Sequence, residues 1–484
     1  MAENKVNNTH DKYDELQPLR DVFDDVCNGT AAMRKGTTKY LPKFPKETDD
    51  SYKFRNETAT FLNVTAKTRE TLCGLVFQKD ITLGEDVPAE IVKLWENIDN
   101  CGNHGNVFCR DLFEDSFDGS AVILVDAPTA QASDKGEQNA LGLRPYWVAY
   151  DACDVINWDY RINPVSRKKE LSLIVLRESH TVAEAMFTRK SEVHYLVCYL
   201  NGNVPSWQRW KETKDAGGKT EHVLESEGTF GKQTALPIAI VGELDDAPPL
   251  MDLAFKNIEH YQTYSDYKSI IHKTCVPLFY SINLDGEPVA IGGDVWFKCT
   301  EGGSIGFAEV SGTSIDKTEQ CLENIKHEMG TLGLAMLAAK PVKGDTTATE
   351  TMLDSIQETS SLQVRATQLK DAIELALGFT AQYLGLGADK GGTITLGATW
   401  TQMIVTAEEL NAWSGLVDAG QMSLETFVEL RHAAGQLPED VDVKTELDRI
   451  EKEMKANAGV KPVVDAKGMP LDETATTKTQ PPVA

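Results

Sequence analysis

Gly231-Lys232-Gln233-Thr234 has the ending of a phosphate-binding loop, in which backbone amides and a lysine hold nucleotide phosphates. The full signature also needs a glycine five residues earlier and a helix that opens at the loop. No glycine stands at that position here, and the residues that follow favour a strand. The pattern therefore does not predict a nucleotide site.

Histidines and acidic pairs are the residues that could hold a metal ion. His260 and His272 stand in one expected helix, and His327-Glu328 lacks the second histidine of a zinc-protease helix. Acidic pairs more often cap turns and helices, and they occur at Asp24-Asp25, Asp49-Asp50 and Asp245-Asp246. The spacing of the residues does not single out a nucleophile with a base and an acid, as a catalytic motif would. We therefore expect no catalytic residue, no metal and no cofactor.

Tyr261, Tyr264 and Tyr267 form a row of tyrosines at spacing three in the first of the predicted long helices. Tyrosine suits a packed surface with one wet edge. The row therefore indicates a contact between subunits rather than a cofactor-binding site.

These tyrosines lie in a helix predicted from Pro249 to Lys273, and a second helix is predicted from Ser314 to Ala339. Apolar residues recur along the second helix in steps of three and four, which is typical of a seam against another helix. The seam includes Leu322, Ile325 and Met329. Between the helices, strands are expected at 276–282 and 295–299. Two helical rods thus carry one small module.

A third helix is predicted after a break at 340–345, which contains proline and glycine. Thr347-Ala348-Thr349-Glu350 is a capping box, and the helix should continue to Tyr383. Its first half is polar and its second half is apolar, so it cannot be buried evenly. One part should be packed and the other exposed to a partner or a lumen.

The remaining stretches predict an α+β fold. Helices are expected at 13–27, 52–77, 89–98 and 107–117, and strands at 120–126, 146–150, 171–177, 193–200 and 237–241. The basic stretch 35–46 is expected to be an extended arm on a neighbouring surface, and 215–220 a hairpin tip or loop. A further strand is expected at 393–398, followed by acidic helices at 406–417, 423–434 and 443–456.

The 484 residues include 48 Lys and Arg against 74 Asp and Glu, for a net charge of −26. Such acidity argues against a broad, tight grip on nucleic acid, but it is compatible with letting nucleic acid slide past. No apolar run is long enough to span a membrane, and the N-terminus lacks a secretory pattern. Nine scattered cysteines without a CxxC pair favour reduced thiols. We therefore expect a soluble intracellular protein.

Four stretches, in this order, carry a resemblance to a known family: 55–63 with 74–77, 146–150 with 154–158, 248–253 through 266–267, and 420–426 with 435–438. Together with the helix plan, they resemble the portal proteins of tailed bacteriophages over about residues 50–455. The resemblance implies a non-enzymatic ring of twelve copies at one capsid vertex, with double-stranded DNA passing through it. It also implies assembly in the host cytoplasm and a final place at the portal vertex of the virion.

The resemblance also assigns parts of the chain. Residues 1–247, with the long helix and link at 347–399, would form an α/β wing. The stem would be 248–273 and 313–339, the β-containing clip 274–312, the tunnel loop 340–346, the helical crown 400–456 and a disordered tail 457–484. Lys340, Lys343 and Thr346 would face DNA, and the subunit interface would include Tyr261, Tyr264, Tyr267, Leu322, Ile325 and Met329. The clip would dock the packaging motor and tail adaptor through Leu284, Asp285, Trp296 and Lys298.

The implied partners are further copies of the chain, double-stranded DNA, a terminase motor, a tail adaptor, and capsid and scaffolding proteins, without a membrane. Two alternatives stay open. A head-completion or tail adaptor would also be a ring, but a smaller one without the stalk. A metal-dependent hydrolase built on the α+β segment would lose its turnover on mutation of Asp126 or Asp151.

Overall fold

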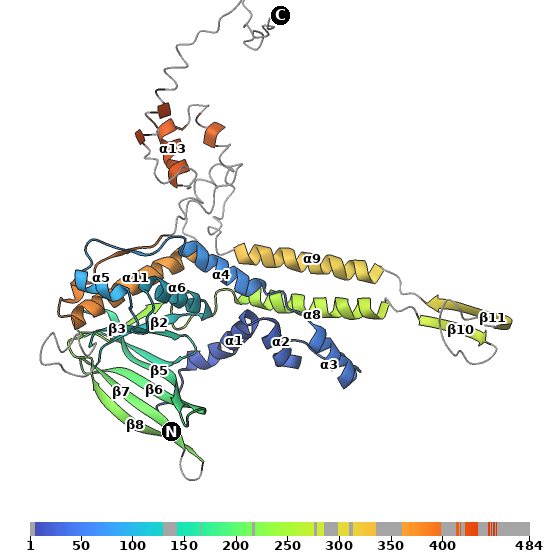
Figure 1. The fold of residues 1–484 in the computed structure, drawn as a ribbon, viewed down its shortest axis with the longest axis horizontal. Coiled ribbons are helices and arrows are strands. Elements are labelled where there is room, and N and C mark those ends of the chain that lie inside the picture. Colours follow the sequence, from blue (N-terminus) through green and yellow to red (C-terminus); the bar gives the residue numbers. More distant parts are fainter. Residues whose placement is uncertain are drawn as a thin grey trace, which may run out of the picture. The chain divides into compact units, whose positions relative to one another are not determined.

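The computed structural model describes residues 5–128, 143–164, 166–214, 218–274, 278–284, 299–308, 313–334 and 361–397, and short pieces between 413 and 452. The chain divides into two compact units, 1–398 and 399–484. In the first unit, helices and antiparallel sheets occupy largely separate stretches of sequence (Figure 1), so the predicted α+β class is confirmed. No helix among these residues is both long and apolar enough to cross a membrane.

The N-terminal region is helical, and four of its helices begin at a side-chain cap, provided by His10, Thr48, Asn63 and His104. Its elements are α1 (Asp11–Cys27), α2 (Thr30–Gly36), η1 (Thr37–Lys39), α3 (Asp49–Thr58), α4 (Val64–Val76), α5 (Ala89–Trp95), α6 (Gly105–Asp115) and η2 (Ser116–Asp118). The single helix expected over 52–77 is wrong, because Thr48 caps α3 and Asn63 caps a separate α4. The extended arm expected at 35–46 is also wrong in its first part, where α2 ends, η1 follows, and Tyr40 and Leu41 are buried in the same chain.

A three-stranded antiparallel sheet lies at the centre of the first unit. Its order is β3 (Tyr146–Asp151), β2 (Ala121–Asp126) and β9 (Ile238–Val241). The bounds of each strand agree with the sequence prediction to within a residue. The first five residues of β2 are buried, which suits a central strand with both faces covered. Helix α11 (Ser361–Tyr383) packs on this sheet, and the Trp147 indole donates a hydrogen bond to the Thr380 hydroxyl (2.9 Å).

A five-stranded antiparallel meander forms the second sheet. Its strands follow in chain order: β4 (Val155–Ile162), β5 (Lys169–Ala183), β6 (Arg189–Asn201), β7 (Val204–Lys214) and β8 (Thr220–Thr229). Strands β5 and β6 are predicted by the sequence, whereas β4, β7 and β8 are missed. In β7 and β8 most side chains are polar and exposed or only partly buried. Lys214 pairs with Thr220, so 215–220 does connect a hairpin as expected.

The predicted helix pair is present as α8 (Met251–Thr274) and α9 (Thr313–Leu334), and the two helices lie side by side (Figure 1). The chain between them contains a two-stranded hairpin, β10 (Leu278–Leu284) and β11 (Cys299–Ala308). The second strand therefore begins where the sequence expectation ends it, since the glycines at 302, 303 and 306 weaken the strand pattern. Residues 335–360 lie outside the described residues, and so do the tunnel loop 340–346 and the start of the third helix.

The remaining described elements are short. Strand β1 (Thr82–Leu83) pairs with β12 (Ile394–Thr395), which lies within the strand expected at 393–398, and η3 (Ala388–Lys390) precedes it. The second unit contains α13 (Leu424–Ala433), close to the helix expected at 423–434. The tail 457–484 lies outside the described residues.

Candidate functional site

The α8–α9 pair is the candidate site, because it joins a buried seam to an exposed charged face. Leu322, Ile325 and Met329 are 5%, 3% and 1% exposed along α9, which packs against α8. Lys256 of α8 bridges the pair, with its ammonium 2.9 Å from Glu259 and 2.8 Å from Glu328. The seam predicted from the sequence is therefore real, but its partner is α8 of the same chain and not a neighbouring subunit.

The tyrosine row has two different environments. Tyr261 is fully buried and packs edge-on against Phe61, with ring centroids 5.7 Å apart. Tyr264 and Tyr267 are half-buried and stacked at 6.4 Å. Tyr261 is therefore a core residue of this chain, a correction to its expected place at a subunit contact, whereas for Tyr264 and Tyr267 that contact stays a prediction.

The base of α8 is fixed by Asn257, which is fully buried. Its side-chain oxygen accepts hydrogen bonds from the Val64 and Thr65 amides (3.0 and 3.1 Å) and from the Thr65 hydroxyl (3.1 Å). Its amide group donates to the Leu62 carbonyl (2.6 Å). One side chain thus satisfies the open N-terminus of α4 and joins that helix to α8.

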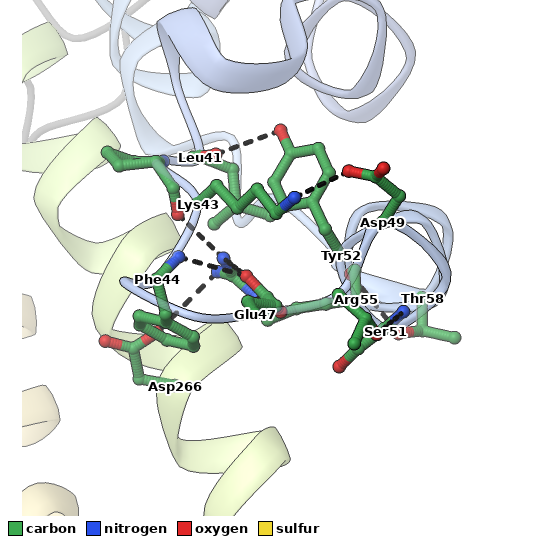
Figure 2. A network of polar contacts seen from close by, with 12 residues as sticks. Leu41, Lys43, Phe44, Glu47, Asp49, Ser51, Tyr52, Arg55, Thr58 and Asp266 are labelled. Atoms are coloured by element: carbon green, nitrogen blue, oxygen red, sulfur yellow. Dashed lines mark hydrogen bonds and ion pairs between the residues drawn. The ribbon is translucent and has the colours of Figure 1, made fainter.

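A second connection to α8 centres on Arg55 (Figure 2). The guanidinium forms a two-pronged pair with Glu47, donates to the Pro42 carbonyl (2.7 Å), and lies 4.0 Å from the centre of the Phe44 ring. Asp266 of α8 lies 3.9 Å from its other nitrogen. The loop that includes 42–47 is therefore closed over α3 and faces α8.

A cleft of about 360 Å³ opens between α8, α9 and residues 60–62. His260 lies at this cleft and is 3% exposed, yet neither of its ring nitrogens has a hydrogen-bond partner among the described residues. Burial lowers the pKa of His260, and Lys326 lowers it further. The ring is therefore neutral at pH 7 and stacks on Tyr264 at 5.9 Å. Unpaired buried polar groups are rare, so this wall is suited to a ligand or a partner side chain.

Residues of the phosphate-loop-like turn, and the two aspartates of the hydrolase alternative, form hydrogen bonds within the fold. Gln233 donates to the Phe379 carbonyl (3.0 Å), and the Thr234 amide donates to Gln382 (3.2 Å), so the phosphate-loop-like turn holds α11. Asp126 accepts from the Tyr146 hydroxyl (3.0 Å), while Asp151 accepts from the Cys153 and Asp154 amides (2.8 and 3.0 Å).

Asp126 and Asp151 cannot share one metal ion. They stand at opposite ends of the β2–β3 ladder, in which Asp126 pairs with Tyr146 and Ala121 with Asp151. Five residues of strand separate them by roughly 17 Å. No group of three or more His, Cys, Asp or Glu side chains in the described ranges is placed to hold a metal ion.

A group of half-buried carboxylates, which the sequence does not predict, comes from α6, η2 and the end of β3. Burial raises the pKa of Asp118 to about 7, with Arg69 opposing and Asp151 adding to the shift. Burial and then Asp151 raise the pKa of Asp115 to about 6. The Asp118 Oδ1 atom has no hydrogen-bond partner among the described residues. Sequence spacing gives no signal for this cluster, because Asp151 reaches it only through the sheet.

The exposed face of α9 is acidic. Asp316, Glu319, Glu323 and Glu328 are exposed there, together with Lys317 and Lys326. Lys326 is paired with Glu323 (2.6 Å) and Glu328 with Lys256 of α8 (2.8 Å), so Asp316, Glu319 and Lys317 remain outside these ion pairs and the net negative charge is small. Such a face does not bind phosphate tightly.

Most of the predicted DNA and docking residues lie outside the described residues. These are Lys340, Lys343, Thr346, Asp285, Trp296 and Lys298. The backbone of Leu284 is the end of β10 and pairs with Cys299. The DNA-facing and motor-docking roles therefore stay predictions.

Residues 249–384 match the model of a family described as a domain of unknown function, DUF4055. The match covers α8, the β10–β11 hairpin, α9 and α11 to its last residue. No curated protein matches the chain. The family match thus coincides with the helix pair and the helix that packs on the central sheet.

Proposed function

We propose that the chain is a portal protein, the subunit of a ring through which double-stranded DNA enters and leaves a phage capsid. The observation that carries the proposal is the α8–α9 pair, whose apolar seam is closed within the chain while the outer face of α9 remains charged and exposed. Each helix is long, roughly 33–36 Å by its rise per residue, and the pair carries a hairpin at its open end. Twelve such pairs side by side would form a tube with few basic side chains in its lining.

The charge of that lining suits a passage rather than a binding site. DNA carries one negative charge per about 1.7 Å of axis, so a basic tunnel would hold it through many released counterions. The scarcity of basic side chains on α9 and the net charge of −26 would instead weaken binding to the phosphates and keep friction low. DNA movement would then be driven by a separate terminase motor that docks at the β10–β11 end.

The clamps at the base of α8 have a role in this proposal. Asn257 and Arg55 tie the stem helix to α4 and to the loop at 42–47. A load on the stem during packaging would pass to the wing through these buried contacts. The other helices of the first unit, with its three-stranded and five-stranded sheets, would form that wing, and the second unit would form the crown.

The test is the mass and shape of the purified particle. Native mass spectrometry and electron-microscopy class averages should show about twelve copies of the 53.3 kDa chain around a central hole. A smaller ring without a stalk would favour the head-completion or tail adaptor. A stable monomer with metal-dependent turnover, lost on mutation of Asp126 or Asp151, would instead establish the hydrolase and overturn the proposal.

A further inference from the structure

The tip of the β5–β6 hairpin exposes two large apolar side chains side by side. Met186 and Phe187 are each 90% exposed, more than any other large apolar side chain among the described residues. The Thr188 amide donates to the Ala185 carbonyl, and the Ala185 amide donates to the Thr188 carbonyl, both at 3.2 Å. Met186 and Phe187 are therefore the two central residues of a tight turn that presents them to solvent.

The conformation of the turn does not explain why Met186 and Phe187 occupy its two central positions. Two-residue hairpin turns favour Asn-Gly or Asp-Gly, and neither Met186 nor Phe187 has the positive φ that such turns use. Single exposed apolar residues are ordinary, but an adjacent Met and Phe at a protruding tip form a typical interface anchor. Arg189, exposed at the start of β6, adds a positive charge two residues away.

The cleft beside α8 has the complementary chemistry. Its lining includes the aromatic rings of Phe61, Tyr264 and Tyr267, and the apolar side chain of Leu62, which is 47% exposed. Glu319 lies at the same cleft, is exposed, and has no ion pair with any described residue. A volume of about 360 Å³ is within the range of natural ligand pockets.

We propose that the β5–β6 tip of one copy inserts Met186 and Phe187 into the cleft of the next copy, with Arg189 facing Glu319. The occupant of the cleft is thus a second copy of this chain, and the Met186 sulfur would contact the aromatic wall that includes the uncharged His260. Because the tip and the cleft are different surfaces, the contact is heterologous, and repeated heterologous contacts close into a ring when the rotation from copy to copy adds up to a full turn. The inference rests on the proposed ring and identifies the residues that join its subunits.

The first experiment is disulfide trapping in the full-length chain. The exposed Cys101 and Cys321 are replaced by serine, and Phe187→Cys is combined with Leu62→Cys. On oxidation, this variant should form a ladder of covalent multimers that reducing agent abolishes. The matched control combines Leu62→Cys with Val223→Cys, an exposed residue of β8 (52% exposed), and should give no ladder above the background of the other cysteines.

The second experiment measures assembly. The double variant Met186→Ser, Phe187→Ser should raise the concentration for half-assembly by about thirtyfold or more, as expected for loss of an interface anchor, with an unchanged melting temperature of the monomer. Arg189→Glu or Glu319→Arg alone should raise it about two- to fivefold, the size of an exposed ion pair. The two charge changes together should restore assembly.

The outcomes separate this inference from the proposed function. Rings that form without the ladder, and that the tip variant leaves intact, overturn the tip–cleft contact while the portal proposal stands. A wild-type chain that never assembles overturns both. A ladder that depends on Phe187→Cys and Leu62→Cys, together with the charge-swap rescue, supports the contact.

Discussion

Arg55 donates two parallel hydrogen bonds to Glu47, from Nε to Oε1 at 3.0 Å and from Nη2 to Oε2 at 2.9 Å, and the two side chains are only 6% and 5% exposed. The guanidinium also lies over the Phe44 ring and bonds to the Pro42 carbonyl (Figure 2). A buried pair of this kind is sensitive to loss of one partner, because the other charge is left without compensation.

Glu47→Gln should therefore lower the free energy of unfolding by about 3–5 kcal/mol, measured by urea denaturation. Replacing both partners, with Glu47→Leu and Arg55→Met, should cost less than Glu47→Gln alone. Asp49→Asn is the matched control, since it breaks the exposed Lys43–Asp49 pair and should change little. Equal losses in the single and double variants would contradict the role assigned to the buried charge.

Asn257→Ala should destabilise the first unit by about 2–4 kcal/mol, because the Val64 and Thr65 amides lose their shared acceptor in a buried site. Asn257→Asp keeps an acceptor oxygen and places a negative charge at the N-terminus of α4, so it should be less damaging. Thermal unfolding of the three chains, with hydrogen exchange of the two amides, is the measurement. An aspartate variant less stable than the alanine variant would mean that the bond to the Leu62 carbonyl dominates.

Asp118 should make stability fall as pH rises. Its folded pKa is raised to about 7, mainly by burial, so the folded state keeps a proton that the unfolded chain releases above about pH 4. Unfolding thus releases a proton between these pH values, and this contribution to stability is lost progressively from pH 4 to pH 7 and is level above that.

The measurement is the free energy of unfolding of wild type and of Asp118→Asn, from urea denaturation at pH 5 and at pH 8. From pH 5 to pH 8, this free energy should decrease more in wild type than in the variant, by about 1–3 kcal/mol. Asp111→Asn, at an exposed carboxylate of α6, is the control and should follow wild type. Parallel curves for wild type and Asp118→Asn would contradict the raised pKa.

Lys340→Glu with Lys343→Glu should leave ring assembly intact and impair DNA packaging or retention, since these lysines are the predicted cationic contacts of the tunnel loop. Packaged DNA per particle and phage yield are the measurements. Lys317→Glu with Lys326→Glu, on the exposed face of α9, tests whether any loss of positive charge has the same effect. Normal yield from the Lys340 and Lys343 variant would remove the tunnel-loop assignment.

A deletion tests the hairpin end of the helix pair. Removal of residues 283–300 should spare the ring and abolish motor docking, because it removes the whole connection between β10 and β11, with the last two residues of β10 and the first two of β11, while α8 and α9 keep their seam. Ring mass and co-purification with the motor protein are the two readouts. Collapse of the ring would mean that the β10–β11 module stabilises the assembly.

Much of the fold follows from local patterns. The apolar repeat at Leu322, Ile325 and Met329 is enough to predict α9 and its buried face, because helical spacing places these side chains on one side. The apolar run of β2 likewise predicts a buried central strand. Strands β7 and β8 are missed because their stability comes from pairing within the meander rather than from an apolar pattern of their own.

The sequence by itself determined the α+β class, the helix pair and the place of the central strands, since each depends on residues that are neighbours in the chain. The tertiary structure decided that α9 packs against α8, and that Asp118 and Asp151 come near enough to interact electrostatically. These features depend on contacts between distant residues, such as Asn257 with Thr65, whose free energy exists only once the chain is folded.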